Sequence, residues 1–253
     1  MSTAAVATPV EDPNPPKSFL ERFIGVFISP GETFADIVRH PGFLAPLITV
    51  AITVSAMVDT MYWKNGMETM TRISLERSPF TSRMPPDQLE KMISDSAAHL
   101  TRTLIITPIF IVLAMVIVML IFAGLGVLIV NAIFGGDAKF KTLLSVAAYA
   151  DLVAVPANLL ALPIIFFGGT ENLDPQNPVP FNLAFFLNYK EVSKPLFALA
   201  GSIDLIPIWT VILLGIGMSK AAGGKVKPLS ITLCFVGAWA VWIVGKVALA
   251  MIF

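Results

Sequence analysis

The sequence predicts an all-α membrane protein, a bundle of five transmembrane helices with amphipathic helices on the N-terminal side. Of the 253 residues, 56% are hydrophobic and only 13% are charged, whereas soluble domains carry about 25% charged residues. Five apolar segments are also long enough to cross about 30 Å of hydrocarbon as helices. They are residues 43–63, 104–134, 143–167, 196–218 and 229–253. Four or six spans would require one of these segments to be re-entrant or split.

The first 42 residues divide into a tail and two short helices. Residues 1–17 are polar, acidic and rich in proline, a composition typical of a disordered tail. Within residues 18–42, Ser18 is followed three residues later by Glu21, which is the spacing of a capping box at a helix start.

The same spacing recurs at Ser29 and Glu32, where Pro30 suits the first helical position. Phe34, Ile37 and Val38 follow on one helical face, before a histidine–proline–glycine break. We expect residues 18–42 to form amphipathic helices on the cytoplasmic face, with this apolar face inserted in the membrane. The alternative is that they are the first turns of a bent first span.

The membrane domain occupies residues 43–253, and its connections are of two kinds. Residues 64–103 form a long polar stretch whose second half, "PPDQLEKMISDSAAHLTR", predicts a helix that runs into the second span. Residues 168–194 form a proline-rich loop with a short apolar segment, "FNLAFFL", expected at the membrane interface. The other two links, "GGDAKFK" and "KAAGGKVKP", are tight.

Lysines are densest in the two tight links, which five spans would place on the same side as the N-terminus. Because lysine and arginine concentrate in short cytoplasmic loops, we expect the N-terminus and both links in the cytoplasm. The lysines concerned are Lys139, Lys141, Lys220, Lys225 and Lys227.

Ionisable residues within the apolar segments are costly and usually face a bundle interior or a cavity. There are four of them, Asp59, Asp151, Asp204 and Lys246. Counted along ideal helices, Asp59, Asp204 and Lys246 fall at one level in the outer half of the membrane, so an Asp204–Lys246 ion pair is one hypothesis. Alternatively, Lys246 extends to the outer headgroups and Asp59 already lies at the interface.

Small residues recur at spacings of three and four along the third span and predict a close-packing helix face. They are Ala147, Ala150, Ala154, Ala157 and Ala161. Asp151 and Asn158 lie on the flank of this stripe and are therefore expected to point into the bundle, whereas Leu152 is expected to face lipid. The polar pair serves either to bond neighbouring helices together or to line a translocation path.

Composition and motifs offer little support for other functions. The net charge is zero and the pI about 6.7, so no basic surface for nucleic acid is indicated. There is one cysteine, Cys234, and the histidines His40 and His99 lack the spacing of a metal site. No phosphate-binding loop or nucleophile motif occurs. We expect no cofactor, no metal and no enzymatic activity, although an intramembrane active site built from dispersed residues stays open.

Three stretches resemble the YIP (Ypt-interacting protein) domain family, in its bacterial branch of polytopic membrane proteins. They are "SPGETFADIVRHPGFLAPLITVAI", "FGGDAKFKTLLSVAAYADLVAVPANLLAL", and the tryptophan-containing span after "SKAAGGKVKP". The resemblance implies five spans, a cytoplasmic N-terminus in the bacterial inner membrane, and a non-enzymatic role. The tyrosine–glycine–proline motif of eukaryotic members is not reproduced, because Tyr149 is followed by Ala150. Their role in vesicle trafficking is therefore not transferred.

The leading functional hypothesis is an integral membrane scaffold or interaction protein. Its expected partners are the lipid bilayer and either another membrane protein or further copies of itself. The alternative is a small-solute or ion transport component that uses Asp151, Asn158, Asp204 and Lys246. Transport requires a water-accessible cavity at Asp151, whereas a scaffold requires a packed interior.

Overall fold

The computed structural model describes residues 15–78, 81, 84–168, 174, 177–188 and 191–252. Within them the regular secondary structure consists of helices, joined by turns and loops, apart from one isolated bridge, Asn182–Asp204. The predicted all-α class is confirmed for this part of the chain. The expected disordered tail lies, up to residue 14, outside the described residues.

Two short helices, α1 (Phe19–Ile28) and α2 (Pro30–Arg39), precede the long ones. The Ser18–Glu21 capping box is present, because the backbone N–H of Ser18 donates to Glu21 Oε2 (2.7 Å) and that of Glu21 donates to Ser18 Oγ (3.3 Å). Ser29 occupies the N-cap of α2 but makes no side-chain cap bond. The second predicted capping box is therefore wrong.

The apolar face of α2 is covered by protein. Phe34 and Ile37 are fully buried, and α2 packs on α6 and α9. At Gly217 a side chain would collide with the Phe34 ring and with Val146, so this glycine permits the close approach of α2. The expectation that Phe34 and Ile37 insert into lipid is wrong, since both side chains are enclosed by the bundle.

The first two long segments are helical over more residues than the predicted spans. Helix α3 (Leu44–Arg77) contains a non-helical residue, Gly66, with φ of 76°, where the helix changes direction. The second segment is continuous through α4 (Pro86–Ser96), η2 (Ala97–His99), α5 (Leu100–Gly126) and the π-helical η3 (Val127–Ile133). The predicted helix that runs into the second span is thus confirmed.

The third segment consists of α6 (Phe140–Ala150), the 3₁₀ turn η4 (Asp151–Val153) and α7 (Ala154–Phe167). Asp151 therefore lies at a change of helix type near the middle of the segment. The tight turn before α6 is closed by Asn131, whose side chain exchanges two hydrogen bonds with the backbone of Ala138 (2.8 and 3.0 Å).

The fourth segment is broken, contrary to the prediction of a continuous span over residues 196–218. After the short turn η5 (Leu183–Phe186), helix α8 (Lys194–Ala200) ends and α9 (Leu205–Ala221) begins anew at Asp204. The carboxylate of Asp204 accepts a hydrogen bond from the Ile206 N–H (2.8 Å), as an N-cap does. The final helix, α10 (Pro228–Ile252), is unbroken.

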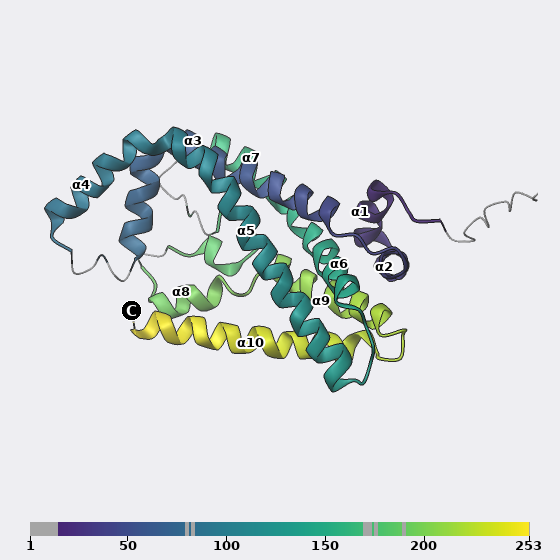
Figure 1. The fold of residues 1–253 in the computed structure, drawn as a ribbon. Coiled ribbons are helices and arrows are strands. Elements are labelled where there is room, and N and C mark those ends of the chain that lie inside the picture. The colour runs from purple at the N-terminus through teal and green to yellow at the C-terminus, as the bar shows by residue number, and fades with distance from the viewer. Residues whose placement is uncertain are drawn as a thin grey trace, which may run out of the picture.

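Four helices of the described chain are long and apolar enough to span a membrane, and α9, with 17 residues, is shorter. The predicted count of five is therefore approximate. In Figure 1, α3 and α7 lie at the top of the view and α10 along the bottom, α6 and α9 lie between them, and α5 crosses the bundle diagonally. Helices α1 and α2 lie at the end of the bundle that also carries the two tight links, while α4 and the end of α10 lie at the other (Figure 1).

Candidate functional site

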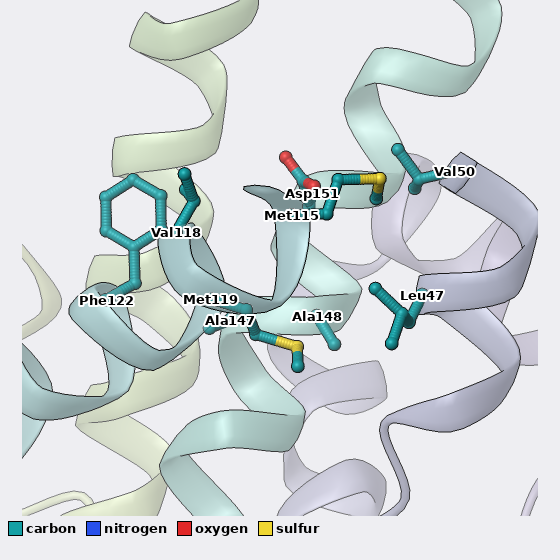
Figure 2. A pocket seen from close by; sticks show the side chains of 9 residues that line it. All are labelled: Leu47, Val50, Met115, Val118, Met119, Phe122, Ala147, Ala148 and Asp151. Carbon is teal, nitrogen blue, oxygen red and sulfur yellow. The ribbon is translucent and has the colours of Figure 1, made fainter. Parts of the chain in front are cut away.

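Asp151 lines a small apolar cavity between α3, α5 and α6 (Figure 2). The space in which the centre of a water molecule can lie is about 10 Å³, close to the minimum for a single water. Apart from Asp151, the lining is Leu47, Val50, Met115, Val118, Met119, Phe122, Ala147 and Ala148. Within the described residues this cavity is thus a site for one small polar molecule at most.

Asn158 is buried and joins two helices. Its side-chain amide on α7 donates to Thr53 Oγ1 on α3 (3.2 Å), and Thr53 in turn donates to the Val50 carbonyl (3.0 Å). Helices α3 and α7 are also in extensive contact. Of the two roles considered for Asn158, this geometry supports the bonding of neighbouring helices.

The alanine stripe forms a packed interior face. Ala147, Ala150, Ala157 and Ala161 are buried, and only Ala154, next to the η4 turn, is partly exposed. The expectation that Leu152 faces lipid is wrong, because this side chain is fully buried as well. Because α6 packs on α5 and α9 while α7 packs on α3, the two halves of the stripe face different neighbours.

Asp204 and Lys246 have different partners. Besides capping α9, the Asp204 carboxylate accepts a hydrogen bond from the Asn182 side chain (3.4 Å). Lys246 is exposed on α10 and donates to Ser202 Oγ (3.4 Å). The structure therefore gives no support to the hypothesis of an Asp204–Lys246 ion pair.

Asp59 lies in α3, and one of its carboxylate oxygens is buried without a hydrogen-bond partner among the described residues. The four intramembrane ionisable residues are distributed over α3, η4, the α9 cap and α10.

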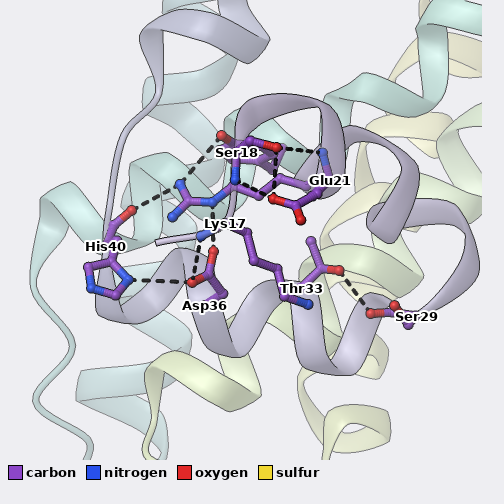
Figure 3. Close-up of polar contacts among 9 residues, drawn as sticks. Lys17, Ser18, Glu21, Ser29, Thr33, Asp36 and His40 are labelled. Carbon is purple, nitrogen blue, oxygen red and sulfur yellow. Dashed lines mark hydrogen bonds and ion pairs between the residues drawn. The ribbon is translucent and has the colours of Figure 1, made fainter. Parts of the chain in front are cut away.

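A buried ion pair, which the sequence analysis did not identify, fixes the N-terminal helices (Figure 3). Arg22 Nε on α1 donates to Asp36 Oδ2 on α2 (2.7 Å), and the two side chains are only 7% and 2% exposed. Arg22 Nη1 also donates to the His40 carbonyl (3.1 Å) and reaches the Tyr149 hydroxyl on α6 (3.5 Å), over whose ring the guanidinium lies at 5.7 Å.

The electrostatics of this pair favour the charged form of Asp36. Burial by itself would raise the pKa of Asp36, but the hydrogen bond and positive charge of Arg22 outweigh it. The Lys17 backbone N–H (3.4 Å) and the His40 ring (3.4 Å) add to the effect, so the pKa lies below its ordinary value of 3.8.

One sequence signal could have revealed the pair. Arg22 shares a helical face with Phe19 and Val26, and a charged residue on an apolar face requires a buried partner. The spacing along the chain does not say which acidic residue is that partner.

The fold and these polar groups define a polytopic, all-helical membrane protein whose interior is largely apolar and contains a few buried polar contacts. The Yip1 domain family model matches residues 24–249, nearly the whole chain, and the protein therefore belongs to the Yip1 domain family. No curated protein and no solved structure shows a significant match to the chain.

Proposed function

We propose that this Yip1-family protein is a non-enzymatic membrane scaffold that acts by binding another membrane protein or further copies of itself. The observation that carries the proposal is that polar groups within the apolar segments bond to the protein's own helices. Asn158 bonds α7 to α3, and Asp204 caps α9. These groups stabilise the bundle, which leaves its outer surface as the part available for interaction.

That outer surface is extensive and apolar. On α5 and α10 most large hydrophobic side chains are exposed, among them Ile117, Leu120, Val241 and Val244. In a membrane such surfaces contact lipid or pack against other helices. Charged groups on the same surface are few, which suits a partner that is itself embedded in the bilayer.

The second candidate function is the transport of a small solute or ion, and the observation in its favour is Asp151. Its carboxylate lies in a cavity near the middle of the third segment, where an ionisable group is a functional hypothesis by default. The cavity is, however, too small for more than one water molecule.

The Asp151→Asn variant separates the two functions, because it keeps the side-chain volume and removes the charge. The protein is purified from membranes in mild detergent with its co-purifying proteins, and it is separately reconstituted in liposomes that contain a pH-sensitive dye. A scaffold retains the same partners in the variant and conducts no more protons than empty liposomes do. Proton flux by the wild type that is lost in Asp151→Asn would instead establish transport.

A further inference from the structure

We infer that α1 is a membrane-surface helix that inserts one apolar stripe into the lipid leaflet nearest the two tight links. The stripe consists of Leu20, Ile24 and Ile28, which are 65%, 46% and 78% exposed. Their spacing of four places them on one side of the helix. The inference concerns contact with lipid and does not depend on the proposed function.

The other side of α1 is bound to protein and determines which side faces out. Arg22, Gly25 and Val26 are buried. At Gly25 a side chain would overlap Thr33 of α2, so the two helices are in close contact there. Together with the Arg22–Asp36 ion pair and the contact of Arg22 with Tyr149, this packing fixes the rotation of α1 about its own axis.

The buried ion pair also removes the electrostatic cost of placing a charged side chain of α1 against lipid. Arg22 is the one basic residue within α1, and its charge is neutralised inside the protein by Asp36. The stripe therefore presents no unpaired cation to the hydrocarbon, where an uncompensated charge is costly.

Lipid suits this stripe better than a protein partner does. A specific protein interface usually involves about 20–30 residues on each side, and three side chains fall far short of that. The stripe is followed along the chain by exposed residues of α3 with the same spacing, Leu44, Ile48 and Ile52, at the start of a segment long enough to span the membrane.

The surrounding charges fit a lipid surface as well. The tight links lie at the same end of the bundle as α1 and α2 (Figure 1), and all five of their lysines are exposed. Exposed lysines at the membrane surface attract anionic headgroups. The apolar face of a surface helix inserts about 5–10 Å below those headgroups.

Spin labels test the inference in the full-length protein reconstituted in liposomes of phosphatidylethanolamine and phosphatidylglycerol. In a Cys234→Ser background, single cysteines replace Ile24 or Ile28, and the label's collision rates with oxygen and with a water-soluble nickel chelate are measured. Ile52→Cys serves as the lipid reference and Asp137→Cys, in an exposed link, as the water reference. Because positions 24 and 28 are exposed, labels there replace no internal packing.

We expect labels at 24 and 28 to collide with oxygen but not with the nickel chelate, at depths of about 5–10 Å below the phosphates. Collision with the chelate at the rate of Asp137→Cys would place α1 in water and overturn the inference. Low collision rates with both reagents would show that protein covers the stripe, such as a second copy of the chain, and would overturn it equally.

Discussion

Arg22 and Asp36 are 14 positions apart in the chain and form a buried ion pair that connects α1 to α2. Removing one member of such a pair strongly destabilises a protein, because the remaining charge is left buried without a partner. Arg22 also contacts the His40 carbonyl and the Tyr149 hydroxyl, so one guanidinium connects α1 with the end of α2 and with α6.

Replacing Asp36 with asparagine is expected to destabilise the protein by about 3–5 kcal/mol at pH 7, the usual cost of breaking a buried pair. The melting temperature in detergent measures this loss. Glu32→Gln is the matched control, since Glu32 is an exposed acidic residue of the same helix and surface substitutions usually change stability by about 0.5 kcal/mol or less. Equal melting temperatures for the two variants would contradict the role assigned to the pair.

The stabilisation from Asp36 is also expected to depend on pH. Its pKa is lower in the folded state than in the unfolded state, so the stabilisation is fully present above the unfolded value near 3.8 and is lost as the pH falls through the lower, folded value. Between pH 7 and 5 the difference in melting temperature between wild type and Asp36→Asn should stay constant. Below pH 4 it should shrink; a difference that stays constant there would contradict the assignment.

The hydrogen bond between Asn158 and Thr53 is expected to contribute less to stability than the ion pair does. In a double-mutant cycle of Asn158→Leu and Thr53→Val, we expect a coupling energy of about 0.6 kcal/mol, typical of hydrogen bonds between membrane helices. Thr60→Val is the control in place of Thr53→Val, because the hydrogen bond that Thr60 makes within the described part of the chain goes to the Ala56 carbonyl of its own helix (2.6 Å). Additive losses for the Asn158–Thr53 pair would show that the bond contributes nothing.

At the scale of whole helices, most local features could be predicted from the sequence, although the Ser29–Glu32 capping box could not, and the packing of one helix against another was not predictable. The Ser18–Glu21 capping box and the helix that enters the second span depend on neighbouring residues, and both were predictable. The break before α9 was missed because its flanks are apolar enough to resemble one continuous span. Its signal was local as well, since Asp204 is a favoured N-cap residue directly before an apolar run.

Burial on the third span was predictable from the sequence, whereas the contacts between the candidate side chains were not. Small and polar residues on the third span correctly indicated a buried face, as the burial of Ala161 and Asn158 shows. Which side chains meet depends on how the helices rotate against each other, and the sequence holds no direct record of that rotation. The same limit applies to Lys246, which contacts Ser202 rather than Asp204.

The packing of α7 can be tested at Ala161, which is fully buried. Ala161→Leu adds volume to a packed face and is expected to cost about 1–3 kcal/mol through overpacking. Leu160→Ala, at a neighbouring position that is 44% exposed, should cost much less. If both variants have the same melting temperature in detergent, the face formed by the alanines is not closely packed.

At the scale of the whole molecule, the arrangement of the two tight links and the N-terminal helices at one end of the bundle makes the topology testable (Figure 1). The positive charge of the links predicts that this end is cytoplasmic. Cysteines that replace Asp137 or Lys225 in a Cys234→Ser background should resist a membrane-impermeant thiol reagent in intact cells, whereas a cysteine at Lys91 on α4 should react. All three positions are exposed, so burial does not confound the comparison. The reverse labelling pattern would invert the topology.

The break between α8 and α9 has a consequence for the membrane itself. At 1.5 Å per residue, the 17 residues of α9 measure about 26 Å, while the 25 residues of its neighbour α10 measure about 38 Å. A bilayer of ordinary thickness, about 30 Å of hydrocarbon, is too thick for one of these helices and too thin for the other. We expect lipids that contact α9 to thin locally, and α10 to tilt so that its length fits the same bilayer. Such hydrophobic mismatch sorts proteins among membranes of different thickness, and a helix as short as α9 favours the thinner ones.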